Sequence, residues 1–200
     1  MSRRRLRMEM LEQRLAWIEP DHYERGSAVS VIERQKGGEG TATFTSPGNN
    51  QLLRFNLSED NRLRLLKQRK VADGILLELE QDGHPARLHL VELKGNVTTG
   101  KWREIKEQLL GALHNAHALT GLLGLPMPEI VECHTCYTKD RISPQESAQP
   151  ALFKPGVGVK LPPRQAQDWQ QGYCELSSEF PRFRHHKHRR DERGDVVVAV

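Results

Sequence analysis

Asp73, Glu92 and Lys94 are the residues of this sequence whose types and spacing could do chemistry. An apolar run follows Asp73, and alternating apolar residues precede Glu92 and Lys94. The charged residues therefore lie only at one end of an apolar pattern. Two carboxylates and one ammonium meeting there suit a divalent cation, because Mg²⁺ prefers oxygen ligands and is commonly held by one or two carboxylates with water and phosphate. The alternative is an ordinary strand end with a surface Glu and Lys, since Glu-x-Lys is a common tripeptide.

A β-hairpin over residues 71–95 is predicted to bring these three residues together. Alternate residues of a strand share a face, so the apolar residues of both strands lie on one face, and that face ends in Asp73, Glu92 and Lys94. The dipeptide Asp82-Gly83 favours a two-residue turn. That register sets Asp73 opposite Glu92, and a longer loop of even length would pair the same faces.

The spacing of Asp73, about twenty residues before Glu92-Leu93-Lys94, resembles the PD-(D/E)XK nuclease superfamily, which includes many restriction endonucleases. The resemblance covers about residues 63–138, well under half the chain, and includes a hairpin followed by a long amphipathic helix. Ala72 stands where the namesake motif has Pro, and many members of the superfamily also lack that Pro. The resemblance implies an α/β fold with a mixed central β-sheet flanked by helices, a restriction-endonuclease-like core in the order helix, three strands, helix, strand.

The same resemblance implies a Mg²⁺-dependent nuclease in which Mn²⁺ can substitute, acting on nucleic acid, DNA rather than RNA. Asp73 and Glu92 would hold the metal, with the backbone carbonyl of Leu93. The metal would polarise the scissile phosphate and lower the pKa of a bound water. Lys94 would stabilise charge on the phosphate or orient the attacking water, and Gln108 would position either partner.

The long helix predicted over residues 101–123 has an apolar stripe at helical spacing, and Gln108 lies at its edge. Related nucleases often place a Gln or Lys of this helix at the active site, a role that Gln108 fits, with Lys101 one repeat earlier. The alternative for Gln108 is an ordinary flanking polar residue. Lys101, together with Arg69 and Lys70 beside Asp73, is expected to contact nucleic-acid phosphates.

Members of the superfamily often supply a further metal-binding carboxylate from upstream of the hairpin. Glu9, Glu12, Glu24 and Glu33 are the candidates, and the sequence does not choose among them.

Cys133-His134-Thr135-Cys136 lies within a strand predicted over residues 129–138. A zinc site needs about four ligands, so this pair would have to recruit His134 and Cys174. The preferred interpretation is that Cys133 and Cys136 include at least one packed core thiol.

The composition predicts one domain with polar extensions, since 36% of the 200 residues are hydrophobic and 28% are charged. The expected segments are an N-terminal helix over 1–20, a nuclease core with a β-rich extension over 21–140, a Pro/Gln-rich extension over 141–178 and a basic tail over 179–200. The extension includes a short apolar element at 151–161. Within the tail, residues 180–194 hold six Arg or Lys and two acids and so carry +4, which equals the net charge of the chain. The tail is expected to be flexible in the free protein, with its final VVVAV apolar enough to add a strand or a subunit contact.

Three cysteines do not make a disulfide framework, and no apolar run is long enough for a membrane span. These features predict a cytoplasmic protein that does not bind membranes. A homodimer or a larger protein complex is plausible, and analogy favours antiviral defence or mobile-element biology. Two alternatives remain: a catalytically silent nucleic-acid-binding module or subunit with the same fold, and an interaction protein whose hairpin charges are structural.

Overall fold

The computed structural model describes residues 3–33, 40–57, 63, 66–143 and 167–200. The elements are, in chain order, α1 (Arg3–Leu15), the 3-10 turn η1 (Pro20–His22), β1 (Tyr23–Gly26), β2 (Ala28–Ile32), β3 (Thr41–Thr45), β4 (Gln51–Phe55), β5 (Gly74–Leu79), β6 (Pro85–Val97), α2 (Thr99–Leu123), β7 (Ile130–Asp140), α3 (Gln167–Gln171), β8 (Tyr173–Cys174), β9 (Phe183–Arg189) and β10 (Val196–Ala199).

Two sheets organise these strands. The central sheet has seven strands in the order β1-β4-β5-β6-β7-β9-β8, and the smaller one has three in the order β10-β3-β2. In the central sheet, β6 pairs parallel with β7 and β7 pairs parallel with β9, while the other pairs are antiparallel. The predicted α/β class with a mixed central sheet and flanking helices is confirmed.

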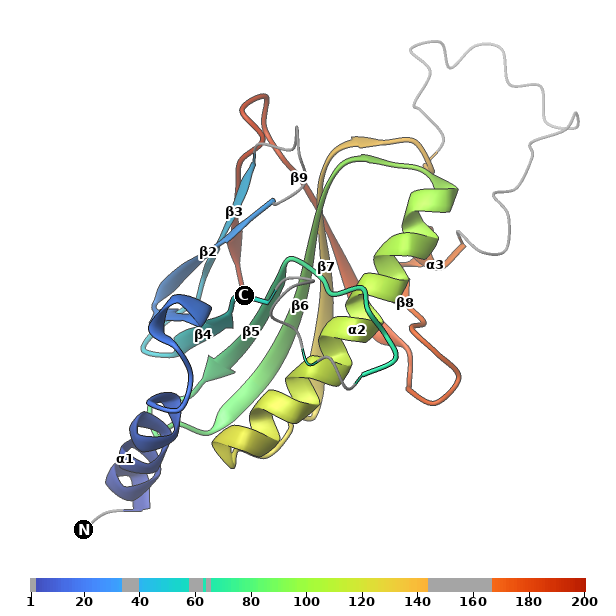
Figure 1. The fold of residues 1–200 in the computed structure, drawn as a ribbon. Helices are drawn as coiled ribbons and strands as arrows, with labels where there is room; N and C mark the ends of the chain where they lie inside the picture. Colours follow the sequence, from blue (N-terminus) through green and yellow to red (C-terminus); the bar gives the residue numbers. More distant parts are fainter. Residues whose placement is uncertain (1–2, 34–39, 58–62, 64–65, 144–166) are drawn as a thin grey trace, which may run out of the picture.

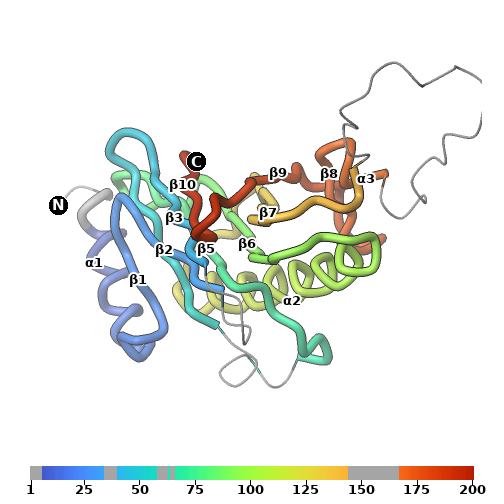
Figure 2. The backbone as a smooth tube through the Cα atoms, turned by 90° about the horizontal axis from the view of Figure 1, so that it is seen from above, coloured from blue at the N-terminus to red at the C-terminus, as the bar shows by residue number. Residues whose placement is uncertain are grey.

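The central sheet lies between α2 on one face and the small sheet on the other (Figures 1 and 2), and each face carries its own apolar cluster. On one face, Ile75 and Leu77 of β5 pack with the buried side of α2, and Leu11 of α1 joins the same core. On the other face, Leu76 of β5 packs with Phe44 of the small sheet. The period of two in β5 and β6 therefore decides which residues meet the helices and which meet the small sheet.

The helix α2 begins two residues before the predicted start and ends as predicted. Thr98 caps it, with its side-chain oxygen accepting a hydrogen bond from the Lys101 N–H at 3.3 Å. Gly124 ends it in the left-handed conformation, with φ of 59°. Arg14 of α1 donates to the carbonyl of Leu123 at 2.7 Å, which fixes α1 against the end of α2.

The β5–β6 hairpin has the predicted register but not the predicted turn. Ile75 pairs with Leu90 and Gly74 with Val91, which puts Asp73 opposite Glu92. The turn itself consists of Gln81, Asp82 and Gly83, closed by a hydrogen bond from the Glu80 N–H to the His84 carbonyl. Gly83 has a positive φ of 80°, and a bulge beside Leu79 offsets the odd loop length. The faces are therefore paired as expected, although the two-residue turn was wrong.

The C-terminal segment is where the structure departs from the flexible tail expected over 179–200. β9 adds to the central sheet beside β7, and β10 adds to the small sheet beside β3. The edge of β7 offers backbone groups that need partners, and Phe183 and His185 of β9 are buried on alternate positions. The charged and histidine-rich sequence of β9 hid this alternation.

The apolar element expected at 151–161 lies outside the described residues. Among the described helices, none is long and apolar enough to cross a membrane.

Candidate active site

The hairpin brings Asp73, Glu92 and Lys94 into direct contact. Glu92 Oε2 accepts a hydrogen bond from the backbone N–H of Asp73 at 3.3 Å. Asp73 Oδ2 accepts one from the backbone N–H of Leu93 at 2.8 Å. The Nζ atom of Lys94 lies 2.6 Å from Glu92 Oε1. Three of the four residues predicted to be catalytic are thus assembled by strand pairing alone.

Burial makes Glu92 an unusual carboxyl group. The residue has no exposed surface, and Lys94 is only 4% exposed. The pKa of Glu92 is raised to about 8. Burial is the largest cause and the negative charge of Asp73 adds to it, whereas the ammonium of Lys94 lowers the pKa. Its Oε1 atom is buried and forms the ion pair with Lys94 without a well-oriented hydrogen bond. Two carboxyl groups therefore lie close together with one ammonium beside Glu92, an arrangement that a second cation would stabilise.

The helix α2 fixes the approach of the chain to Asp73. The Ala72 N–H donates to the backbone carbonyl of Gln108 at 3.1 Å. One turn on, a Cβ at Gly111 would lie 1.8 Å from the carbonyl oxygen of Lys70, so only glycine permits this close approach. The hydrogen bond that links Gln108 to the approach to Asp73 is therefore made by its backbone carbonyl, and its side chain is half-buried.

The predicted phosphate-binding rim contains acids as well as bases. Lys70 pairs with Glu107 at 2.7 Å, and Lys101 pairs with Glu104 at 2.8 Å. The hydrogen bond from Lys101 is the largest effect lowering the pKa of Glu104, and the charges of Lys70 and Lys94 add to it. Sequence reasoning missed both acids, although the three-residue spacing of Lys101 and Glu104 on a helix is a signal for such a pair. Arg69 is exposed on the same stretch as Lys70.

The four upstream carboxylates are dispersed. Glu9 lies on α1, Glu12 pairs with Arg25, and Glu24 pairs with Arg54 at 3.1 Å.

Glu33 forms a buried ion pair with Arg190 at 2.7 Å. Burial raises the pKa of the Cys136 thiol to about 12, with Arg190 lowering it and Asp73 raising it. Arg190 and Asp73 are therefore both within electrostatic reach of one thiol. The ion-pair partner of Glu33, Arg190, therefore acts on the same thiol as Asp73 does.

Cys133 and Cys136 do not form a shared site. Cys133 packs in the core beneath α2, whereas Cys136 packs beneath the small sheet on the opposite face. Residues three apart in a strand point to opposite faces, so these two thiols cannot bind one metal. All three cysteines are free and buried, which agrees with the interpretation as core thiols.

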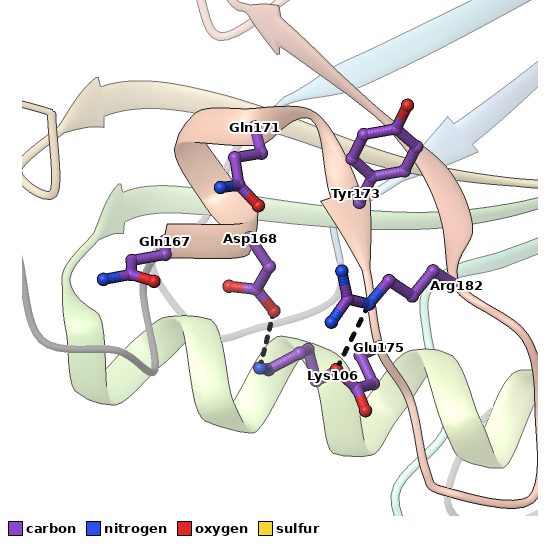
Figure 3. Close-up of a pocket in the computed structure, with 7 residues that line it drawn as sticks. All are labelled: Lys106, Gln167, Asp168, Gln171, Tyr173, Glu175 and Arg182. Atoms are coloured by element: carbon purple, nitrogen blue, oxygen red, sulfur yellow. Dashed lines mark hydrogen bonds and ion pairs between the residues drawn. The ribbon is translucent and has the colours of Figure 1, made fainter.

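A hollow of about 300 Å³ lies over α2, α3 and β8 (Figure 3). Its charged groups pair with each other: Lys106 lies 2.8 Å from Asp168, and Arg182 lies 3.6 Å from Glu175. None of the three hairpin residues that form the candidate active site lines it. The hollow is thus separate from the candidate active site.

A group of histidines on the other face of the sheet was also missed by sequence reasoning. It comprises His89, His134, His186 and His188, with Glu132 among them. The alternation of His186 with His188 was the available signal, but those residues were assigned to a flexible tail.

No protein-family model, no curated protein and no solved structure matches this chain. The described strands and helices establish an α/β protein with a mixed sheet. Its function must be argued from the geometry of Asp73, Glu92 and Lys94.

Proposed function

We propose that this protein is a Mg²⁺-dependent nuclease of the PD-(D/E)XK type that hydrolyses phosphodiester bonds in DNA. The observation that supports this most is the convergence of Asp73, Glu92 and Lys94 at one end of the β5–β6 hairpin, with α2 packed beside it. Two carboxylates and a lysine in that order are the residues that the superfamily uses.

The residues present fit a hard divalent cation. Asp73 and Glu92, with the backbone carbonyl of Leu93, would be its protein ligands, all of them oxygens. The buried Oε1 of Glu92 lacks a well-oriented hydrogen bond and has the Lys94 ammonium 2.6 Å away, so a bound metal would share this carboxylate with Lys94. When bound, the ion supplies polarisation of the phosphate and a lowered pKa for a coordinated water.

Lys94 and Asp73 have distinct tasks in this proposal. The ammonium of Lys94 is a compact charge held beside Glu92 at 2.6 Å, where it would stabilise negative charge developing on the phosphate. The hydrogen bond from the Leu93 N–H fixes the Asp73 carboxylate. Gln108 acts as a positioning residue, because its carbonyl holds Ala72 next to Asp73.

DNA would approach along the rim that holds Arg69, Lys70 and Lys101. Lys70 and Lys101 are paired with acids of α2, so phosphates would have to replace Glu107 and Glu104 as partners. Such exchange makes binding weak and strongly salt-dependent. By analogy with restriction endonucleases, we place the activity in defence or mobile-element biology.

One observation favours a second candidate, a catalytically silent nucleic-acid-binding module with the same fold. Glu92 is fully buried and already paired with Lys94, so its charge has a partner without any metal. Metal-dependent turnover separates the two candidates.

The test is cleavage of plasmid DNA, single-stranded DNA and RNA by the full chain with Mg²⁺, with Mn²⁺ and with EDTA. We expect DNA cleavage that EDTA abolishes and that Lys94→Ala reduces by about 100-fold or more. The matched control is Lys139→Ala, an exposed lysine of β7, which should cleave like the unchanged protein. A Lys94→Ala variant with an unchanged rate would overturn the proposal. Binding of DNA without cleavage under any metal condition would favour the silent module.

A further inference from the structure

Five metal-ligating side chains meet on the face of the central sheet that lies opposite α2. His89 comes from β6, Glu132 and His134 come from β7, and His186 and His188 come from β9. Glu92 and Lys94 are three and five residues from His89 along β6 and so point to the other face. This histidine cluster is therefore separate from the candidate active site.

Strand pairing explains why residues so far apart in the sequence assemble here. His89 lies beside Glu132 across the β6–β7 pair, and His134 lies beside His186 across the β7–β9 pair. The three strands run side by side in Figure 1. Each of these side chains is therefore held by one of three adjacent strands of the central sheet.

The distances within the cluster are those of coordinating atoms. His89 Nδ1 lies 3.1 Å from His134 Nε2 and 3.6 Å from Glu132 Oε2. Nε2 of His186 lies 3.4 Å from Glu132 Oε1. Ligand atoms of His89, Glu132 and His134 all lie within 4.8 Å of one another. In a tetrahedral zinc site with bonds of about 2.0–2.1 Å, ligand atoms are roughly 3.3 Å apart.

We propose that this cluster is a zinc site in which His89, Glu132 and His134 are ligands and His186, which contacts this group at Glu132 Oε1, moves closer to supply the fourth. His89 would coordinate through Nδ1, His134 and His186 through Nε2, and Glu132 through its carboxylate. Imidazole nitrogens with one carboxylate are a ligand set suited to Zn²⁺. The site joins β9 to the middle of the sheet.

Buried atoms without hydrogen bonds are the second observation that points to a ligand. His186 Nε2 is buried and makes no hydrogen bond within the described part of the chain, and the same is true of His89 Nε2 and Glu78 Oε2. Leaving such atoms unsatisfied is costly. A metal at the cluster would satisfy His186 directly.

The surroundings of the cluster match the outer shell of a metal site. Ligating histidines commonly direct the other ring nitrogen at a carboxylate or another acceptor. Nδ1 of His134 lies 3.0 Å from His188 Nε2, and Nε2 of His89 lies 3.9 Å from Glu78 Oε2. Glu78 is itself held by Asn50, whose amide donates to its Oε1 at 2.8 Å.

A chain of hydrogen bonds among neutral rings is the competing account. It explains the contacts from His89 through His134 to His188. It leaves His186 Nε2 without a hydrogen bond, although Glu132 Oε1 lies 3.4 Å away, and it does not include Glu132. The metal accounts for both.

Access to the cluster is from the side of His186. Phe44 of the small sheet contacts the ring of His134 edge-on, with centroids 5.3 Å apart, and covers that side. The side chain of His186 is 33% exposed, whereas that of His89 is fully buried. An ion can therefore enter without unfolding of the sheet.

The experiment is calorimetric titration of ZnCl₂ into the full chain after treatment with EDTA and its removal. We expect one equivalent to bind, thermal unfolding to shift upward because the ligand binds only the folded state, and Co²⁺ to give the visible absorption of a tetrahedral site. His134→Gln should abolish binding. Glu78→Gln should weaken it about 10–100-fold, as loss of an outer-shell partner does.

His186→Gln keeps the test valid if His134→Gln fails to fold, because His186 is partly exposed, and it should weaken binding and remove the tetrahedral Co²⁺ spectrum. His84→Gln, an exposed histidine of the hairpin turn, is the matched control and should bind like the unchanged protein. Asp73→Asn should also retain full zinc binding, which separates this site from the proposed nuclease site. Absence of zinc binding, or binding that His186→Gln leaves unchanged, would overturn the proposal.

Discussion

Asp73 and Glu92 hold each other in place through the backbone of the opposite strand. Glu92 Oε2 accepts the N–H of Asp73 at 3.3 Å, and Asp73 Oδ2 accepts the N–H of Leu93 at 2.8 Å. Each carboxyl group therefore stabilises the strand end that carries the other. A change at either residue should affect both folding and any chemistry at the site, and suitable variants can separate the two.

Asp73→Asn should separate the structural role of Asp73 from its role as a ligand. The amide oxygen of Asn can still accept the Leu93 N–H, so we expect a loss of less than about 1 kcal/mol in the free energy of unfolding. Asp73→Ala leaves that buried N–H unsatisfied and should lose about 1–3 kcal/mol. Both variants should lack metal-dependent cleavage, because neither keeps the negative charge. The measurements are urea denaturation and the plasmid assay, and cleavage by Asp73→Asn at the unchanged rate would contradict the assignment.

Two glycines of α2 should respond to alanine in opposite directions. A Cβ at Gly111 would lie 1.8 Å from the Lys70 carbonyl oxygen, so Gly111→Ala forces the helix away from the segment before Asp73. We expect a loss of about 1–3 kcal/mol in unfolding free energy.

Gly121→Ala is the matched control, because a Cβ there meets nothing within 4 Å. It should stabilise the protein by about 0.5–1 kcal/mol through helix propensity. Chemical denaturation of both variants measures the difference, and equal effects at the two positions would show that the close approach to Lys70 is unimportant.

Asp140 should make the fold sensitive to acid. Its carboxylate accepts hydrogen bonds from Ser143 Oγ at 2.7 Å and from Trp169 Nε1 at 3.0 Å. Burial raises the pKa of Asp140, but the hydrogen bonds from Ser143, Trp169 and Ile142 outweigh it, so the pKa is lowered overall. A carboxyl group whose pKa is lower in the folded state contributes stability above its unfolded pKa of about 4, and this contribution is lost as the pH falls below that value.

Asp140→Asn should therefore lower the free energy of unfolding by about 1 kcal/mol at pH 7. This is at the low end of the range for hydrogen bonds to charged groups, because Asp140 is partly exposed. It should lose less stability than the unchanged protein when the pH is lowered through 4. Denaturation curves at neutral and acidic pH measure both effects. Glu129→Gln, at an exposed carboxyl group just before β7, serves as the control. Identical acid sensitivity of Asp140→Asn and the unchanged protein would exclude Asp140 as the source.

The sequence by itself determined the hairpin and which of its faces carries charge. Side chains alternate with a period of two, so Asp73, Glu92 and Lys94 had to share a face once the register was set. The structure has a turn of odd length, yet the bulge beside Leu79 restores that register. The apolar stripe likewise determined the end of α2, since helical periodicity depends on neighbouring residues only.

Tertiary structure decided the burial of Glu92, the closeness of α2 at Gly111 and the histidine cluster. His134 and His188 are 54 residues apart and meet because β9 pairs with β7. That pairing is made by backbone hydrogen bonds, which any residue type can form, and so the alternation of His186 with His188 was the one weak local sign of a strand in a charged, histidine-rich segment. Contacts between residues distant in the chain are set by how strands are ordered in the sheet, and residue type and spacing along one segment do not encode that order.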